Sequence, residues 1–169
     1  MGALTPVRAG VPADGVSIGA LAARAWRSAY AGLLAPDVLD GLDAAQQGGE
    51  WHAYLSGLPA RDRMWVTGAV GAITGFARTG PCQDPDVGAS TGEVHGLYVD
   101  PDRIGTGLGH SLFQHAVADL HERHAPVVVW HFAGNDRAAR FYERAGFRLD
   151  GAERESDFGV VEVRRRATV

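Results

Sequence analysis

The chain has 169 residues, of which 46% are hydrophobic and 21% charged, and its net charge is −4. These values are typical of a globular protein and predict one domain, residues 1–169, with a sizeable core. The negative charge argues against a dedicated nucleic-acid binder. All 16 basic residues are arginine, which excludes chemistry that depends on lysine, and the single cysteine, Cys82, can form no internal disulfide. No apolar run reaches membrane-spanning length and the N-terminus does not read as a signal peptide, so we expect a cytoplasmic protein.

The spacing of hydrophobic residues predicts a mixed α/β sheet. A short strand near the N-terminus is followed by an amphipathic helix and two further helices. A hairpin, a third strand, a helix, a buried strand and a last helix then precede two closing strands. Asn135 suits the N-cap of that last helix, and Gly146 suits its end. The predicted strands are Leu4–Arg8, Met64–Thr67, Ala72–Thr79, Glu93–Val99, Pro126–Trp130, Phe147–Arg154 and Phe158–Arg165, and the predicted helices are Asp14–Ala31, Pro36–Leu42, Ala44–Leu55, Leu108–Leu120 and Asp136–Arg144.

Two charged clusters in the second half are expected to be solvated. The run from Arg164 to Arg166 is predicted to lie on an edge strand, because charged side chains are rarely buried without partners. His121 and His124 resemble the zinc pattern H-E-x-x-H but stand one residue too close together. No metal site is therefore predicted.

The stretch Gly92–Leu120 combines a strand, a glycine-rich turn and an amphipathic helix. Gly105, Gly107 and Gly109 alternate at the strand-to-helix junction, where the first helical N–H groups have no partner within the helix. Such a helix start is suited to an anion, for example a pyrophosphate. The pattern lacks the lysine of a P-loop, and His110 stands where a dinucleotide motif needs its last glycine. A nucleotide such as ATP or NAD, and a tight turn with no ligand, remain alternatives.

The same stretch resembles the cofactor-binding motif of the GNAT-superfamily acetyltransferases. In that family the pyrophosphate of acetyl-CoA lies on a loop of pattern Gln/Arg-x-x-Gly-x-Gly/Ala. Gly107 and Gly109 stand at the two small positions, whereas Ile104 stands at the Gln/Arg position and Arg103 lies one residue early. Because backbone amides supply most of the anion binding, the resemblance implies a weaker or rearranged contact at Ile104 rather than a lost site.

Two further blocks extend the resemblance over nearly the whole chain. Residues Asn135–Phe147 resemble the family pattern Asn-x-x-Ala-x-x-Phe/Leu-Tyr-x-x-x-Gly-Phe. Trp26, Tyr30 and the stretch Gly32–Pro36 resemble the entry helices of members that act on small molecules or amino acids. The resemblance implies a mixed, mostly antiparallel sheet of six or seven strands flanked by about four helices.

The resemblance also implies roles for individual residues on the acetyl-CoA side. The backbone of Leu97, Tyr98 and Val99 pairs with the pantetheine arm in the family, and by resemblance the Val99 N–H faces the thioester oxygen. Asn135 contacts the pantetheine arm, and Tyr142 protonates the leaving thiolate. For Tyr142 the alternative is a core aromatic beside Phe141. The full implied set is Leu97, Tyr98, Val99, Ile104, Gly105, Thr106, Gly107, Leu108, Gly109, His110, Ser111, Asn135 and Tyr142.

The general base is expected on the strand before the glycine loop. Glu93 is favoured, because a carboxylate in a central strand is costly without a role. His95 is a rival or a partner, since its usual pKa suits proton transfer near neutral pH. Alternation along the strand predicts that Glu93, His95 and Leu97 share one face. Structural roles stay open for both residues: Glu93 near a solvated strand start, and His95 in the core.

The acceptor side is the least defined by sequence. By resemblance it is lined by the first two helices and by the loop before the glycine strand. This arrangement places Trp26 and Tyr30, together with Asp84 and Asp86, near the entrance, where aromatic rings and acids suit a cationic amine.

The resulting hypothesis is an acetyl-CoA-dependent N-acetyltransferase that acts by direct attack of a primary amine. Its partners are a small-molecule or peptide amine, with neither nucleic acid nor membrane, and a homodimer is compatible with the family. Two alternatives remain at this point. The protein could use another acyl-CoA or a hydroxyl acceptor, or it could bind acyl-CoA as a silent sensor.

Overall fold

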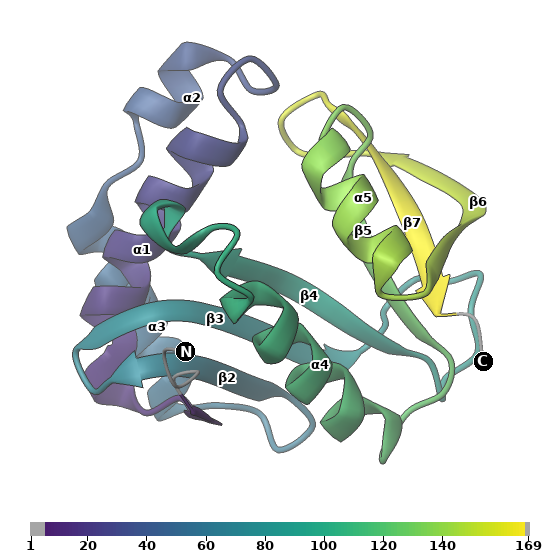
Figure 1. Cartoon of the computed structure of the whole chain (residues 1–169), viewed down its shortest axis with the longest axis horizontal. Helices are drawn as coiled ribbons and strands as arrows, with labels where there is room; N and C mark the ends of the chain where they lie inside the picture. Colours follow the sequence, from purple (N-terminus) through teal and green to yellow (C-terminus); the bar gives the residue numbers. More distant parts are fainter. Residues whose placement is uncertain (1–5, 168–169) are drawn as a thin grey trace.

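A seven-stranded sheet in the order β1-β2-β3-β4-β5-β7-β6 runs through the molecule (Figure 1). The computed structural model describes residues 6–167. Neighbouring strands are antiparallel except β4 and β5, which are parallel. The strands are β1 (Val7–Ala9), β2 (Arg63–Ala69), β3 (Ala72–Pro81), β4 (Gly92–Val99), β5 (Val127–Phe132), β6 (Phe147–Glu155) and β7 (Val161–Ala167). The α-helices are α1 (Gly15–Ala29), α2 (Pro36–Asp40), α3 (Ala44–Ser56), α4 (Leu108–His121) and α5 (Asp136–Arg144).

The predicted mixed, mostly antiparallel sheet is confirmed. Within residues 6–167 there are five α-helices, which are the five that the residue pattern predicts, including the short helix Pro36–Asp40; the resemblance implied about four. The first strand is Val7–Ala9 instead of Leu4–Arg8, and Leu4 and Thr5 lie outside the described residues. The other predicted elements agree with the observed ones to within a few residues.

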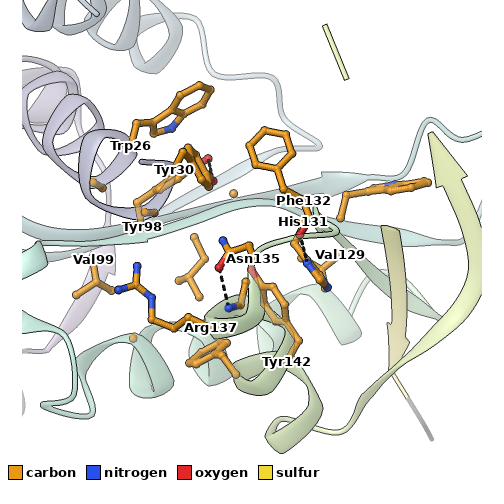
Figure 2. A pocket seen from close by; sticks show the side chains of 18 of the residues that line it. Trp26, Tyr30, Tyr98, Val99, Val129, His131, Phe132, Asn135, Arg137 and Tyr142 are labelled. Carbon is orange, nitrogen blue, oxygen red and sulfur yellow. Dashed lines mark hydrogen bonds between the residues drawn. The ribbon is translucent and has the colours of Figure 1, made fainter. Parts of the chain in front are cut away.

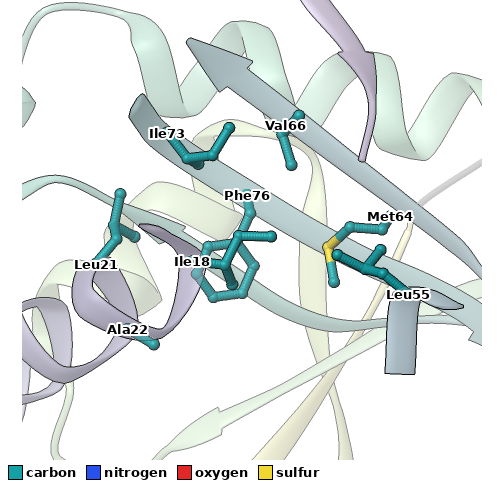
Figure 3. Packing of buried hydrophobic residues seen from close by; sticks show 8 residues of the cluster. All are labelled: Ile18, Leu21, Ala22, Leu55, Met64, Val66, Ile73 and Phe76. Carbon is teal, nitrogen blue, oxygen red and sulfur yellow. The ribbon is translucent and has the colours of Figure 1, made fainter. Parts of the chain in front are cut away.

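Helices cover both faces of the sheet. On one face, α1 and α3 bury Ile18 and Leu55 against Phe76 of β3 (Figure 3). Because side chains alternate along a strand, the next residue, Ala77, packs on the opposite face against Leu112 of α4. No helix in the described range is long and apolar enough to cross a membrane.

The two halves of the sheet separate between β4 and β5. Only three residue pairs join these strands, from Gly92 opposite Val127 to Val94 opposite Val129. Beyond that point β4 continues to Val99 along β3, and β5 continues to Phe132 along β7. The outer parts of β4 and β5 therefore face each other without a hydrogen-bonded ladder.

A β-bulge in β4 lies just past the last paired residue. Val94 pairs with Thr79 and Gly96 pairs with Arg78, which leaves His95 without a partner on β3. An extra residue moves the following side chains to the other face. Val94 accordingly packs toward α4 and α5, whereas Tyr98 packs toward α1.

The bulge makes one prediction wrong. Glu93, His95 and Leu97 were expected to share a face, but strict alternation stops at the bulge. Leu97 packs against Leu112 of α4, on the face opposite to Tyr98. Glu93, the neighbour of a residue that faces α4, points instead to the face covered by α1 and α3.

The three consecutive arginines are also placed differently from the prediction. They lie on β7, which is between β5 and β6 and is not an edge strand. The Arg164 side chain is only 4% exposed and pairs with Asp84, Asp86 and Asp150 at 2.8, 2.6 and 2.7 Å. Its buried charge is thus neutralised by carboxylates from a loop and from β6. The sequence concealed this because these partners are distant along the chain.

We predict that Arg164→Met destabilises the fold. Removing the guanidinium leaves Asp84 and Asp150 without their main partner, which costs about 3 kcal/mol. For a chain of this length that loss lowers Tm by about 10 °C. Arg166→Met is the matched control, because Arg166 lies 3.7 Å from Asp150 and is 43% exposed, and its loss should cost less than about 1 kcal/mol.

The stability difference between wild type and Arg164→Met depends on pH in a defined direction. Burial alone opposes ionisation of Asp84, but hydrogen bonds from Arg164 and Trp130 outweigh it and lower the pKa of Asp84. A carboxyl with a lowered pKa stabilises the fold above its unfolded-state value of about 4, and this contribution is lost as the pH falls through the folded-state pKa. Thermal unfolding should therefore separate wild type from Arg164→Met at neutral pH and bring them together in acid. Equal Tm values at neutral pH would contradict the prediction.

Candidate active site

A cavity of about 900 Å³ occupies the opening between β4 and β5. Its walls come from α1, the outer half of β4, the loop that leads into α4, the end of β5, α5, and the β6–β7 hairpin. Figure 2 shows Tyr98 and Val99 on one side of this space and Val129, His131 and Tyr142 on the other. The cavity exists because the strand ladder stops after three pairs.

The glycine-rich loop forms one rim of the cavity. Gly105 and Gly107 have φ of +81° and +86°, a left-handed conformation that residues with a Cβ rarely adopt. Gly109 is needed for a different reason, because a Cβ there would lie 3.3 Å from Cγ2 of Val99. The first glycines thus shape the turn, and the last lets α4 approach β4.

The start of α4 presents backbone N–H groups at this rim. The first helical hydrogen bond runs from the Ser111 N–H to the Gly107 carbonyl, so the N–H groups of Leu108, Gly109 and His110 precede it. Among the described residues, no side chain caps this helix end. The helix dipole adds a partial positive charge. This rim is therefore built to receive an anion.

Most residues assigned to acetyl-CoA binding on sequence grounds line the cavity. Three do not: the Leu108 side chain is buried, the Thr106 hydroxyl donates to the Arg103 carbonyl, and Ser111 lies beyond the rim. For Leu108 and Thr106, only backbone groups remain available at the rim. The residues that do line the cavity are Leu97, Tyr98, Val99, Ile104, Gly105, Gly107, Gly109, His110, Asn135 and Tyr142.

Arginines near the glycine loop were missed as a group by the sequence reasoning. Arg137, Arg140 and Arg144 line the cavity from α5, and Arg103 lines it from the turn after β4. The spacing of three and then four residues along α5 places its three arginines on one helical face. Figure 2 shows the Arg137 side chain extending toward Val99. That spacing was the available signal, and it adds positive charge beside the start of α4.

Asn135, the N-cap of α5, and Tyr142, in the last turn of α5, both line the cavity. The Asn135 Oδ1 accepts a hydrogen bond of 3.1 Å from the Ala138 N–H, which confirms its predicted capping role (Figure 2). Tyr142 is 7% exposed, and its ring packs against Phe113 and His131. Burial raises the pKa of Tyr142, so its hydroxyl keeps its proton at physiological pH. A buried phenol at a cavity wall can act as a proton donor.

His131 of β5 packs against the Tyr142 ring and is itself held by Arg165 of β7. The Arg165 Nε donates to the His131 Nε2 over 2.8 Å, so the proton of the imidazole lies on Nδ1, facing the Phe132 carbonyl at 2.9 Å. Burial lowers the pKa of His131. The ring therefore stays neutral and holds a fixed orientation against the Tyr142 ring, 5.8 Å between centroids.

Glu93 and His95 form a close pair on the acceptor face. The His95 Nδ1 lies 3.3 Å from the Glu93 Oε1, and both residues line the cavity. On its far side, His95 borders Gly80, where an added Cβ would lie 3.3 Å from His95 Nε2 and 2.6 Å from Asp62 Oδ1. Tyr54 donates to Asp62 over 2.7 Å. The absence of a side chain at Gly80 thus leaves room for a second carboxylate behind the histidine.

An aromatic wall closes the end of the cavity opposite the glycine-rich loop, which is called the acceptor end below because the resemblance implies that an acceptor would enter there. Trp26 contacts Tyr30 edge to face at 5.1 Å and Phe158 of the β6–β7 hairpin at 5.6 Å. Tyr30 in turn contacts Phe132 at 4.8 Å. Trp26 is thus part of the cavity wall, and its contact with Phe158 bridges the two halves of the molecule.

Asp84 and Asp86 do not lie in the cavity lining, contrary to the prediction. Asp84 accepts hydrogen bonds from Trp130 and Arg164, and Asp86 pairs with Arg164. Their charges are used to hold the loop after β3 against β7. The acids that do line the acceptor end are Glu93, Glu155, Asp157 and Glu162.

Cys82 lies close to Asp84 and Glu93. One ligand atom each from Cys82, Asp84 and Glu93 falls within a group of 4.8 Å. Asp84, however, is engaged by Arg164, and burial raises the pKa of the Cys82 thiol to about 12. A protonated thiol is neither a metal ligand nor a nucleophile at neutral pH.

Comparison with known proteins shows which family the chain belongs to. The family model described as the acetyltransferase (GNAT) family matches residues 22–147. The chain belongs to the GNAT family of acetyltransferases. The match includes the glycine loop and the Asn135–Gly146 segment, and it ends before β7. The residues of β7 that line the acceptor end are thus outside the matched part of this GNAT chain.

Individual relatives agree with the family assignment. A probable N-acetyltransferase of Mycobacterium tuberculosis is 28% identical over 148 residues, covering 86% of this chain and 80% of the relative. The PaiA N-acetyltransferase of Thermoplasma acidophilum, solved with coenzyme A, has a TM-score of 0.70 at 16% identity, covering 95% and 98% of the two chains. The yncA structure of Salmonella typhimurium, solved with acetyl-CoA, has a TM-score of 0.70 at 19% identity over 97% and 93%. The structural likenesses establish the GNAT fold.

We predict that Cys82 of this GNAT chain is unreactive in the native state. With a pKa of about 12, its thiolate fraction at pH 8 is far below that of a free cysteine. Alkylation by iodoacetamide, followed by mass spectrometry, should be at least about a hundredfold slower than in the denatured chain and should accelerate as the pH rises. Rapid native labelling at pH 7 would contradict this and would make Cys82 a candidate nucleophile.

Proposed function

We propose that this chain is one catalytic unit that transfers the acetyl group of acetyl-CoA to a primary amine. The observation that carries the proposal is the opening between β4 and β5, which ends at the uncapped start of α4. It offers a β-strand edge for an extended amide-bearing chain and an anion site for phosphates, side by side. Acetyl-CoA has both parts, whereas ATP and NAD have no pantetheine arm.

The residues of the cavity fit this donor. The N–H groups at the start of α4, with Gly105 and Gly107 in left-handed conformations, suit the pyrophosphate. Arg137 and Arg140 add charge that phosphates require, which compensates for Ile104 at the family's Gln/Arg position. The cavity volume of about 900 Å³ is within the usual range for a ligand site.

The chemical step divides between the two ends of the cavity. Glu93, with His95 at 3.3 Å, accepts the proton of the acceptor ammonium and leaves a nucleophilic amine. The amine nitrogen attacks the thioester carbonyl and the C–N bond forms. The nitrogen then releases a second proton to solvent as the tetrahedral adduct collapses and the C–S bond breaks. The Val99 N–H stabilises the oxyanion. Tyr142, kept protonated by burial, gives its proton to the departing thiolate.

Acetyl-CoA binding is the direct test of the donor. Calorimetric titration should give micromolar affinity for acetyl-CoA and CoA and no comparable affinity for ATP or NAD. Release of free thiol in the presence of amines then tests catalysis. Tight binding without turnover of any amine would favour an acyl-CoA sensor, and turnover with hydroxyl acceptors or longer acyl-CoA esters would reassign the substrate.

We predict that the α5 arginines contribute to donor affinity. The double variant Arg137→Gln/Arg140→Gln should weaken acetyl-CoA binding by about tenfold or more, because it removes two charge-assisted phosphate contacts. The salt dependence of binding should also decrease. Arg148→Gln is the matched control, since Arg148 is exposed, bonds the Glu143 carbonyl and lies outside the cavity. Equal losses in both variants, or none in the first, would rule out this role.

Tyr142→Phe should lower kcat by about a hundredfold with little change in KM, because only proton donation in the transition state is lost. The hydroxyl is removed from a packed ring, so stability should be kept. Ser56→Ala is the control, since it removes a hydroxyl that bonds the His52 carbonyl outside the cavity. If kcat of Tyr142→Phe equals that of wild type, another group protonates the thiolate.

A further inference from the structure

The lining charges of the cavity are sorted by sign between its two ends, with Arg154 at the acceptor end as the exception. The cofactor end carries Arg103, Arg137, Arg140 and Arg144. The four lining acids all lie on the inner part of β4 or on the β6–β7 hairpin. The acceptor end therefore has the field of an anionic site, which attracts cations and repels carboxylates. The lining acids are Glu93, Glu155, Asp157 and Glu162.

Glu162 is positioned to act on an acceptor rather than on the protein alone. It lies on β7 opposite Phe132, and its side chain is 19% exposed. Its charge reaches the phenols of Tyr30 and Tyr98 across the cavity, where it contributes to their raised pKa values after the larger effect of burial. Glu162 lines the same cavity as Trp26, Tyr30 and Phe132 of the aromatic wall.

The aromatic wall suits a positive charge as well. Trp26, Tyr30, Phe132 and Phe158 meet edge to face around the acceptor end. Rings in this arrangement present π-faces and hydrocarbon surface but no charged donor. An ammonium group near such faces gains cation–π attraction, and the carboxylate of Glu162 beside them strengthens the site.

Within the described residues, acids outnumber cations in the lining of this end of the cavity. Arg154 is the one lining cation there, and it is held by Glu162 at 2.7 Å and by Asp84 at 3.5 Å. Its guanidinium also stacks on the Trp130 ring, 4.1 Å from the centroid. The charge of Arg154 is thus balanced by the carboxylates that hold it, and the remaining acids leave this end of the cavity with an excess of negative charge.

We propose that the acceptor is a small amine that carries a second positive charge and no carboxylate. Glu93 receives the reacting amine. The distal ammonium is received by the aromatic wall and by the Glu162 carboxylate, which Arg154 bonds through Oε2. This inference rests on the proposed function. It narrows the acceptor from any primary amine to diamines and related polycations, and it excludes free amino acids.

The test compares three amines of equal length that differ only in the distal group. Pentane-diamine, pentylamine and aminopentanoate each carry a terminal amine on a five-carbon chain, with a positive, neutral or negative distal end. We expect kcat/KM to fall by about tenfold from the diamine to the monoamine and further to the amino acid. The preference should shrink with added salt.

A variant of Glu162 tests whether the preference for the diamine arises at the proposed site. In Glu162→Gln the diamine should lose its advantage, the monoamine should be nearly unchanged, and aminopentanoate should improve because Arg154 is released. Glu153→Gln is the control, since it removes an equal charge from an exposed part of β6 outside the cavity. The unchanged monoamine rate separates a specificity effect from a folding defect.

Failure of this inference is distinguishable from failure of the proposed function. A wild-type preference for pentylamine or aminopentanoate, an unaltered preference in Glu162→Gln, or turnover of none of the three overturns the acceptor class. The proposed function is judged separately, by acetyl-CoA binding and by thiol release with a broad set of amines.

Discussion

The site depends on how little of β4 and β5 is paired. Three residue pairs hold these parallel strands together, and the ladder then stops at Val94 and Val129. The bulge at His95 follows at once, and bulges increase strand twist and end regular pairing. A continuous ladder would fill the space that is now a cavity. The bulge also turns Tyr98 toward α1 while leaving Glu93 and His95 in contact, so one irregularity creates the cavity and arranges its acceptor face.

Opening a sheet in this way requires each half to be held by other contacts. The N-terminal half is held by apolar packing of α1 and α3 on β2 and β3. The C-terminal half relies more on charge, with Arg164 at the centre of three carboxylates and Arg165 bonded to His131. These pairs order the loop after β3 and fix the face of β7 that looks into the cavity. Buried arginines that are paired with carboxylates thus contribute to holding the C-terminal half of the sheet.

The cavity joins two electrostatic environments. Backbone N–H groups and arginines gather at the start of α4 and on α5, while carboxylates and aromatic rings gather at the other end. Burial acts on the groups between them, since it keeps the Tyr142 hydroxyl protonated and the His131 ring neutral. A donor with phosphates and an acceptor with positive charge are thereby drawn to opposite ends of one space, with a proton acceptor and a proton donor between them.

The sequence by itself determined the order of elements, the glycine turn before α4, the cap at Asn135 and the family. These features are local: they depend on periodicity, left-handed glycines and capping within a few residues. Only the tertiary structure decided that β7 lies inside the sheet, which arginines are buried, and that Leu97 leaves the face of Glu93. Those outcomes depend on strand order, on a bulge that breaks period-two alternation, and on ion partners far apart in the chain, such as Arg164 and Asp84. The acceptor site is assembled in the same way, since Trp26, Glu93 and Glu162 meet only when α1, β4 and β7 are folded around one opening.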